Sequence, residues 1–192
     1  RDQPMGAGCT GFLVAPDIMV TAGHCINKMN YVRKRFVFGY RMTSPRSPVT
    51  NISNEEIYKV KRVIVSKVES HGADFAVVQL DRPVANHDPL ILSTRRVKKN
   101  DQVSILGHPV GLPLKYASDA QVVSDWSDSY FKATLDSYGG NSGSPVFNKY
   151  YEVVGILVRG EHDFIMRRGC RVSAIIPSSS FYRTGESVTR VS

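Results

Sequence analysis

The sequence predicts an all-β fold. Short runs rich in Val, Ile, Phe and Tyr recur along its 192 residues, and Gly, Pro, Asn and Asp separate them. Helical periodicity is limited to a turn expected over residues 22–27 and a weak stretch near residues 178–183. Because β-branched and aromatic residues favour strands, and Gly and Pro favour turns, this pattern is typical of a β-barrel or a β-sandwich.

The expected strands form two groups along the chain. They cover residues 11–14, 35–38, 60–65, 74–80, 103–106, 122–123, 153–158 and 172–176. Between the groups, residues 81–99 contain Pro83, Pro89 and a polar, basic stretch that interrupts the strand pattern. We therefore expect two domains, residues 1–88 and residues 89–192.

The chain carries 25 Lys and Arg against 17 Asp and Glu, a formal charge of +8. Its basic residues are scattered or lie in short clusters without interleaved aromatic residues for base stacking, so we expect no nucleic-acid binding. A cationic surface that favours acidic protein substrates or an anionic cell surface agrees with this charge. No apolar run approaches the roughly 18 residues of a membrane span, and the sequence contains no basic-then-apolar leader. We therefore expect any secretion signal to have been removed or to lie outside this sequence.

Ser142 lies in the Gly-Asn-Ser-Gly-Ser-Pro motif of residues 140–145. A serine hydroxyl becomes a good nucleophile when a histidine accepts its proton, and flanking glycines let backbone N–H groups turn toward a developing oxyanion. The Thr-Ala-Gly-His-Cys segment of residues 21–25 supplies such a histidine, His24. Together the two motifs predict serine-protease chemistry.

A third group should lie between the early histidine and the late serine, to hold the imidazole in the right tautomer. Asp74 is the candidate because it opens the apolar run of residues 74–80, where a carboxylate is costly to bury without a partner. The alternative is an aspartate exposed in a turn at the start of a strand. Given the other two motifs, we expect Asp74 to pair with Nδ1 of His24.

On these three motifs the chain resembles the chymotrypsin-like serine proteases, in particular the bacterial branch with the Gly-Asn-Ser-Gly-Ser-Pro motif. The resemblance covers nearly the whole chain and keeps the family's order of His, Asp and Ser. It implies two perpendicular six-stranded antiparallel β-barrels, with the catalytic triad in the cleft between them. Residues 1–88 would form the barrel that carries His and Asp, and residues 89–192 the barrel that carries Ser and the S1 pocket. Because the family has another strand upstream of Cys9, the first barrel can be incomplete at its N-terminus.

The resemblance also implies roles for individual residues. His24 corresponds to the general base, Asp74 to the carboxylate that orients it, and Ser142 to the nucleophile. The backbone N–H groups of Gly140 and Ser142 would form the oxyanion hole. Asn141 replaces the aspartate that captures a new N-terminal amine in animal trypsins, so this activation switch is not expected. The mechanism requires no cofactor and no metal.

The cysteines fit the same resemblance, which pairs Cys9 with Cys25 in a disulfide beside the catalytic histidine. Closing a loop of that length contributes about 3 kcal/mol in the chain-entropy model. A disulfide implies an oxidising compartment, so we expect a secreted or periplasmic protein. Cys170 is left over, and we expect a buried apolar thiol on a core strand; the alternative is pairing with another chain or with residues outside this sequence.

The resemblance extends to the S1 pocket, which receives the substrate side chain before the scissile bond (P1). Asp136 corresponds to the carboxylate at the base of this pocket in trypsin-like enzymes, and Gly160 and Gly169 correspond to its wall glycines. A buried acid behind two glycines favours Arg or Lys. Ser137 is compatible with basic and acidic P1 residues alike. Pairing of Asp136 with a nearby arginine would instead fill the pocket; the candidates are Arg159, Arg167, Arg168 and Arg171.

Two alternatives stay open. Glutamyl endopeptidases share the nucleophile motif, but they have a histidine at the position of Leu157, and Asp136 would repel an acidic P1 side chain. A catalytically silent protease-like binding protein would use the barrels and the basic surface for recognition, although such proteins usually lack a triad residue. In either enzyme the partners are protein or peptide substrates, and the sequence predicts no particular oligomeric state.

Three further histidines are expected to have no catalytic role. His108 lies in a Gly/Pro loop and is expected to be structural or to face solvent. His71 is close to Asp74 in sequence but has no definite role. His162 stands between Glu161 and Asp163, which is more typical of a solvated loop than of a cation site, so we assign no metal.

Overall fold

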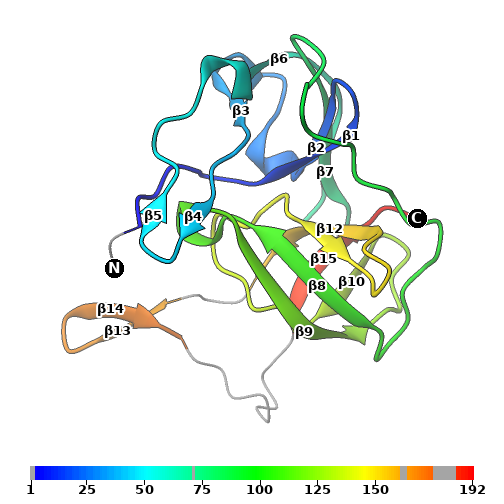
Figure 1. The fold of residues 1–192 in the computed structure, drawn as a ribbon. Coiled ribbons are helices and arrows are strands. Elements are labelled where there is room, and N and C mark those ends of the chain that lie inside the picture. Colours follow the sequence, from blue (N-terminus) through cyan, green and yellow to red (C-terminus); the bar gives the residue numbers. More distant parts are fainter. Residues whose placement is uncertain (1–2, 71, 161–163, 175–184) are drawn as a thin grey trace.

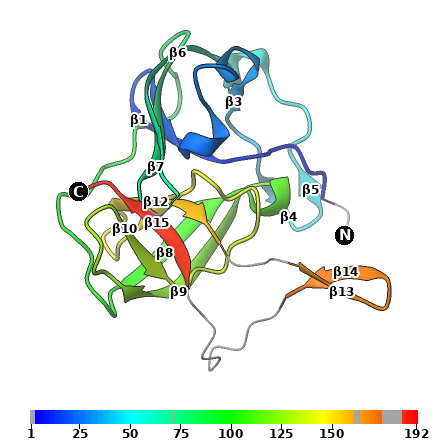
Figure 2. The same cartoon turned by 180° about the vertical axis from the view of Figure 1, so that it is seen from behind.

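The computed structural model describes residues 3–70, 72–160, 164–174 and 185–192. Two β-sheets dominate it, one from residues 11–80 and one from residues 102–190. Figures 1 and 2 show one sheet above the other, with the amino-terminal segment passing between them. The all-β prediction is confirmed. The predicted domain boundary at residue 88 falls in the connection between the sheets and stays a prediction.

The amino-terminal sheet has five antiparallel strands in the order β1-β2-β7-β6-β3. Alternate residues of β7 are buried, as expected for a strand with one face on a core. Buried side chains of this core include Leu13, Met19, Tyr58 and Val78. The strands are β1 (Gly11–Ala15), β2 (Ile18–Thr21), β3 (Arg35–Val37), β6 (Ile57–Val68) and β7 (Asp74–Leu80).

This sheet curls without closing into a barrel. β1 and β3 form its two edges, and residues of both strands line a cavity of about 960 Å³. His87 and His108 also contribute to the lining. Among the described residues, the first barrel is therefore a half-barrel of five strands, in agreement with the expectation that this barrel can be incomplete.

The carboxy-terminal sheet is a closed barrel of six strands in the order β10-β15-β12-β11-β8-β9. Val103, Ile105, Phe131 and Val188 are among the buried side chains that fill it. The strands are β8 (Gln102–Gly107), β9 (Lys115–Ser124), β10 (Tyr130–Ala133), β11 (Pro145–Phe147), β12 (Val153–Arg159) and β15 (Glu186–Arg190). This barrel agrees with the prediction from the sequence.

A third set of buried residues joins the two sheets. Phe12 and Val20 of the amino-terminal sheet pack with Phe147, Ile156 and Val158 of the barrel. β12 is buried along nearly its whole length because one side faces the barrel core and the other faces this interface. Since burying one such side chain contributes about 1.5–3 kcal/mol, the interface holds the two sheets in a fixed relation.

Smaller elements connect the strands. The turn expected over residues 22–27 is the 3-10 helix η1 (Gly23–Cys25), whereas the weak helical stretch near residues 178–183 lies outside the described residues. The other short helices are η2 (Tyr31–Arg33), η3 (Asn54–Glu56) and η4 (Pro109–Gly111). Two hairpins complete the fold: β4 (Met42–Ser44) with β5 (Ser47–Pro48), and β13 (Phe164–Arg167) with β14 (Cys170–Ser173). The β13–β14 hairpin projects from the body of the molecule in both views (Figures 1 and 2).

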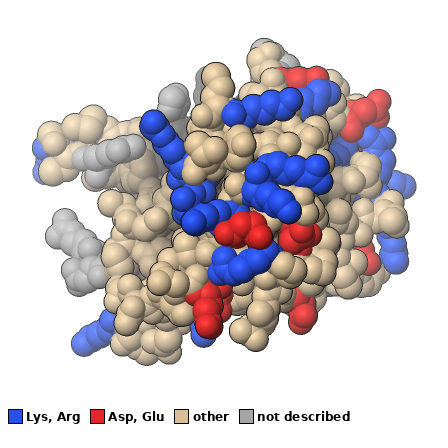
Figure 3. Space-filling model, turned by 90° about the horizontal axis from the view of Figure 1, so that it is seen from above, with Lys and Arg blue, Asp and Glu red and all other residues tan. Residues whose placement is uncertain are grey.

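Basic side chains are abundant on the face above the amino-terminal sheet. Figure 3 shows more Lys and Arg than Asp and Glu on this face. In the same sheet, β6 carries the exposed residues Lys59, Lys61 and Arg62. Of the helices in the described part of the chain, none is long and apolar enough to cross a membrane.

Candidate active site

His24 lies on η1, directly after β2, in a turn that a glycine allows to pack against β6 and β7. A Cβ added at Gly23 would lie 2.9 Å from the carbonyl oxygen of Phe75 and would collide with the carbonyl oxygen of Lys67. Any larger residue would therefore push η1 away from the sheet. The glycine before His24 thus brings the imidazole to the start of β7.

Asp74, the first residue of β7, forms two hydrogen bonds with His24. Its Oδ2 lies 2.9 Å from Nδ1 of the imidazole, and its Oδ1 accepts the backbone N–H of His24 at 3.1 Å. The Asp74 side chain is 1% exposed, whereas that of His24 is 39% exposed. Burial raises the pKa of Asp74, but the hydrogen bonds and charge of His24, with the charge of Arg159, outweigh it and lower the pKa below its usual value. The carboxylate is therefore held ionised beside the imidazole.

The barrel holds the backbone of Asp74 through Thr189 of β15. The N–H of Asp74 donates to the Thr189 hydroxyl at 3.0 Å, and the hydroxyl donates to the Asp74 carbonyl oxygen at 3.2 Å. Both residues are buried. A residue of the second sheet thus fixes an acid of the first.

Arg159, at the end of β12, also reaches the Asp74 carboxylate. Its Nη2 lies 3.6 Å from Asp74 Oδ2 and donates a hydrogen bond to the backbone carbonyl of Glu69. Sequence reasoning considered Arg159 as a partner of Asp136, and among the described contacts its ion pair is with Asp74. The sequence offered no signal for this partner, because the two residues are far apart in the chain.

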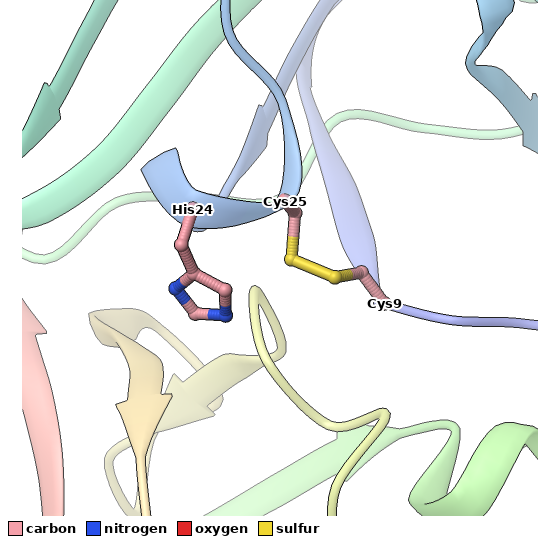
Figure 4. A group of neighbouring side chains, drawn as sticks. All are labelled: Cys9, His24 and Cys25. Carbon is pink, nitrogen blue, oxygen red and sulfur yellow. A yellow bond between two sulfur atoms is a disulfide. The ribbon is translucent and has the colours of Figure 1, made fainter. Parts of the chain in front are cut away.

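The predicted disulfide between Cys9 and Cys25 is present, with the two Cα atoms 6.3 Å apart. Figure 4 shows Cys25 on η1 beside His24, joined to Cys9 in the segment that precedes β1. The sulfur atoms and the His24 ring nitrogens lie close together, but each sulfur is already bonded to the other. This group is therefore a covalent staple of the histidine turn and offers no thiolates to a metal.

The loop that carries Ser142 depends on two glycines in the left-handed region of backbone conformation. Gly140 has φ +96° and Gly143 has φ +89°. A Cβ at Gly140 would lie 2.6 Å from the carbonyl oxygen of His108, and a Cβ at Gly143 would lie 2.9 Å from the backbone nitrogen of Ala22. Glycine is thus required at both positions by the backbone angle and by the space.

Hydrogen bonds divide the N–H groups of this loop into two sets. The N–H groups of Asn141, Gly143 and Ser144 donate to the carbonyl oxygens of Tyr138, Leu157 and Asn141, at 3.0, 2.7 and 2.9 Å. The N–H groups of Gly140 and Ser142 donate to no group among the described residues. These two donors are the pair that the sequence predicts for an oxyanion hole.

The Ser142 loop lies against the histidine turn. Ser142 accepts the N–H of Thr10 at its carbonyl oxygen, at 2.8 Å, and Cys25 Sγ lies 3.8 Å from the same oxygen. Within the described part of the chain, no hydrogen bond joins the Ser142 hydroxyl to His24. In structures without substrate this hydrogen bond is often long and forms fully only in the complex.

The residues predicted for the S1 pocket occupy different environments. Asp136 is exposed, in contrast to the burial that we expected, while Ser137 is partly buried. A second acid was missed by sequence reasoning: Glu186 on β15 is 8% exposed, and a Cβ on Gly160 would collide with its carboxylate. The absence of a side chain at Gly160 therefore makes room for a buried acid at the end of β12.

The β13–β14 hairpin holds the remaining predicted residues. Gly169 lies in its exposed turn, where an added Cβ would meet none of the described residues within 4 Å. Its assignment to a pocket wall stays a prediction. Cys170 is exposed, and the prediction of a buried core thiol is wrong: within the described part of the chain, β14 pairs only with β13 and contributes to neither main core. His71 and the group of Glu161, His162 and Asp163 lie outside the described residues.

The remaining predicted histidine, His108, has a structural environment. Its Nδ1 lies 2.8 Å from the carbonyl oxygen of Leu112, its ring stacks on Tyr40, and burial lowers its pKa. A neutral ring that donates from Nδ1 to a carbonyl accounts for these contacts.

Fold and site together define a class: chymotrypsin-like β-proteins in which a buried aspartate binds an exposed histidine beside a glycine-rich serine loop. Residues 9–156 match the family model described as a trypsin-like peptidase domain. The chain belongs to this family of trypsin-like peptidases.

A curated relative and two solved structures are similar to the chain. The extracellular metalloprotease of Bacillus subtilis is 28% identical in an alignment of 156 residues that covers 74% of this chain and 47% of the relative. The chain thus spans about half the length of that relative. A Glu endopeptidase in complex with MPD has a TM-score of 0.61 at 18% identity and covers 98% of this chain and 82% of its own. The inactive form of the protease Rv3671c from M. tuberculosis has a TM-score of 0.56 at 15% identity, with coverages of 95% and 78%.

Proposed function

We propose that the protein is a serine endopeptidase that hydrolyses peptide bonds through Ser142, His24 and Asp74. The observation that carries the proposal is the buried Asp74 carboxylate, which binds both the ring and the backbone of His24 beside the serine loop. A carboxylate in this position holds Nδ1 protonated and leaves Nε2 free to accept a proton. The family match supports a peptidase, and the Ser142 motif supports the serine type.

In the proposed mechanism His24 removes the proton of Ser142 as the hydroxyl oxygen attacks the substrate carbonyl. The carbonyl oxygen becomes an oxyanion, which accepts hydrogen bonds from the N–H groups of Gly140 and Ser142. His24 then gives its proton to the leaving amine, and Asp74 stabilises the imidazolium during both transfers. Water then attacks the acyl-enzyme while His24 accepts its proton. The bond from the acyl carbon to Ser142 Oγ breaks, and His24 returns the proton to this oxygen, which releases the acid product and restores the serine hydroxyl.

We further propose a preference for Arg or Lys at P1. Two acids support it: Asp136, at the predicted base of the pocket, and Glu186, whose carboxylate lies against Gly160. Ala133, three residues before Asp136, pairs with Glu186 across β10 and β15, so both acids belong to one side of the barrel. An acidic P1 side chain would be repelled by these carboxylates, and Leu157 offers it no positive charge.

Location outside a reducing cytosol, either secreted or periplasmic, is part of the same proposal. The Cys9–Cys25 disulfide supports it, because such bonds persist in oxidising compartments. The substrates would be proteins or peptides. No cofactor takes part in the steps above.

Labelling of Ser142 with a fluorophosphonate tests the proposal. The folded protein should be labelled at Ser142, and the Ser142→Ala and His24→Ala variants and the urea-unfolded protein should not. A folded parent that stays unlabelled would identify a catalytically silent binding protein. Peptides that differ only at P1 then test specificity: cleavage after Arg and Lys should dominate, and equal cleavage after Arg, Glu and Phe would contradict the pocket assignment.

A further inference from the structure

Thr10 forms hydrogen bonds with its backbone N–H, its carbonyl oxygen and its hydroxyl, and these bonds link the serine loop to neighbouring segments. It is 6% exposed and lies between Cys9 and β1. Its N–H donates to the Ser142 carbonyl oxygen at 2.8 Å, and its hydroxyl donates to the Gly140 carbonyl oxygen at 3.1 Å. One residue of the amino-terminal segment thus binds two carbonyl groups of the loop.

The same residue is itself held in place from two sides. Its hydroxyl accepts the N–H of His108 at 3.1 Å, and its carbonyl oxygen accepts the Thr21 hydroxyl at 2.6 Å. A hydroxyl can donate once and accept from further donors, so the Thr10 hydroxyl bridges Gly140 and the His108 turn without conflict. The position of Gly140 is therefore coupled to β2 and to the loop after β8.

These contacts complete a pattern in the backbone of residues 139–142. The Gly139 carbonyl oxygen accepts the N–H of Val110 at 2.5 Å, and the Asn141 carbonyl oxygen accepts the N–H of Ser144 at 2.9 Å. Thr10 donates to the other two carbonyl oxygens of the stretch, those of Gly140 and Ser142. Every carbonyl of the four-residue stretch thus has a donor, and each peptide plane is fixed.

Fixed peptide planes decide where the unused N–H groups of Gly140 and Ser142 point. Gly139 and Gly140 have no side chains that would limit rotation of the peptide units between them. Hydrogen bonds must therefore supply the restraint, and an oxyanion hole is effective only when its donors are oriented before the charge develops. Val110 has φ +47°, which is rare for a β-branched residue, and this strained turn aims its N–H at Gly139.

We propose that Thr10 is a positioning residue, whose hydroxyl ties the Gly140–Asn141 peptide unit to the His108 turn. This unit lies between the two peptide units that carry the oxyanion-hole donors, so holding it limits the rotation of both. This inference rests on the proposed serine-peptidase function. The Thr10 hydroxyl does not touch the substrate or the reacting atoms. Loss of this hydroxyl should destabilise the transition state and tetrahedral adducts, because both contain the oxyanion. It should have little effect on binding of the intact substrate.

Substitution of Thr10 separates the hydroxyl from the shape of the side chain. Thr10→Val keeps the shape and loses both hydroxyl hydrogen bonds, whereas Thr10→Ser keeps the hydroxyl. Ser93→Ala is a matched control, because the buried Ser93 hydroxyl also donates to an oxygen, that of Glu152, and accepts a backbone N–H, that of Arg95, away from the loop. It accepts a further, longer hydrogen bond from the Asn148 amide. Thermal unfolding identifies folded variants, and Thr10→Ala replaces Thr10→Val if the latter does not fold.

The measurements are kcat and KM for a peptide with P1 Arg, and inhibition by the corresponding peptide aldehyde, which forms a tetrahedral adduct with Ser142. Loss of one oxyanion donor lowers turnover about 100-fold to 1,000-fold, so a misoriented donor in Thr10→Val should lower kcat about 10-fold to 100-fold. The affinity for the aldehyde should fall by a similar factor, while KM changes less than about threefold. Thr10→Ser and Ser93→Ala should stay near the parent.

The outcomes distinguish this inference from the proposed function. A parent protein that neither cleaves the peptide nor reacts with a fluorophosphonate overturns both. An active parent with a Thr10→Val variant of equal kcat and equal aldehyde affinity overturns the role of Thr10 alone. Equal losses in Thr10→Val and Thr10→Ser, or a loss confined to KM, would likewise exclude orientation by the hydroxyl.

Discussion

Arg159 and His24 approach the same carboxylate oxygen of Asp74, the imidazole Nδ1 at 2.9 Å and the guanidinium Nη2 at 3.6 Å. Asp74 is almost completely buried, whereas the Arg159 side chain is 35% exposed. The carboxylate therefore interacts with the proposed general base, His24, and with a guanidinium that contributes mainly positive charge.

Replacement of Arg159 by Met should make the protein less stable to acid. The pKa of Asp74 is lowered in the folded state, so its contribution to stability is complete above the unfolded pKa, near 3.8, and is lost as the pH falls through the lower folded value. Arg159→Met raises the folded pKa, so part of this contribution should disappear. Urea unfolding at pH 2–7 measures the effect. Arg96→Met, whose partner Asp128 is 95% exposed, is the control and should leave the profile unchanged.

Asp74→Asn should lower kcat about 10,000-fold, because an amide that donates to the imidazole favours the wrong tautomer. Kinetics with a P1 Arg peptide measure the loss. The same variant should unfold at low pH with a weaker pH dependence than the parent, since Asn does not titrate. A kcat within tenfold of the parent would show that Asp74 does not orient His24.

Loss of the Cys9–Cys25 disulfide should lower the free energy of unfolding by about 3 kcal/mol, which is the loop-closure contribution expected for a loop of this length. The comparison is urea unfolding of the oxidised parent and of a variant with Cys9→Ser and Cys25→Ser. Activity should fall as well, because Cys25 lies beside His24 and against the Ser142 carbonyl group. Equal stability of the two proteins would contradict the staple role.

Two glycines with similar backbone angles should respond differently to alanine. Gly143→Ala should abolish activity, because the new Cβ has no room beside Thr10 and Ala22. Gly169 has φ +75°, and an added Cβ would meet none of the described residues within 4 Å. Gly169→Ala should therefore lower the free energy of unfolding by only about 1 kcal/mol, from the strain of a left-handed backbone. Peptide hydrolysis and urea unfolding of both variants test the difference. Similar losses in both would argue against tight packing of the serine loop.

Cys170 should react with a maleimide in the folded protein, because its thiol is exposed and Cys9 and Cys25 are joined. Mass spectrometry should find one label per chain, located at residue 170, and the Cys170→Ser variant should take up none. Labelling that occurs only after unfolding would favour the buried thiol that the sequence suggested.

Sequence patterns predicted the parts of this protein whose causes are local. The apolar runs at β7, β8 and β12 are strands because their residues alternate in burial or are buried on both faces. The glycines around His24 and Ser142 are required because the backbone comes too close for a side chain or has a positive φ. β15 was missed because four of its five residues are polar: Glu186, Ser187, Thr189 and Arg190. Closure of the barrel, and not their composition, buries Glu186 and Thr189.

Other features depend on contacts between distant segments, which no single stretch encodes. The partner of Arg159 is decided by how the end of β12 meets the start of β7. Cys170 is exposed because, in the described residues, its strand β14 is hydrogen-bonded to β13 and to no other strand. The apolar residues that follow Cys170 in the sequence had predicted a core strand. Asp136 is exposed although its neighbour Leu135 packs in the barrel core, and a motif alignment does not reveal this difference between adjacent residues.

The contacts of Thr189 and Thr10 make the two halves of the molecule mutually dependent. Thr189 of the barrel holds Asp74 of the amino-terminal sheet, and Thr10 of the amino-terminal segment holds the loop of Ser142. Cutting the connection at residues 81–101 would give two fragments. Each fragment would lack the proposed catalytic groups of the other, and also the threonine that holds its own groups in place. Catalysis by two separated fragments would therefore require them to reassemble into one body.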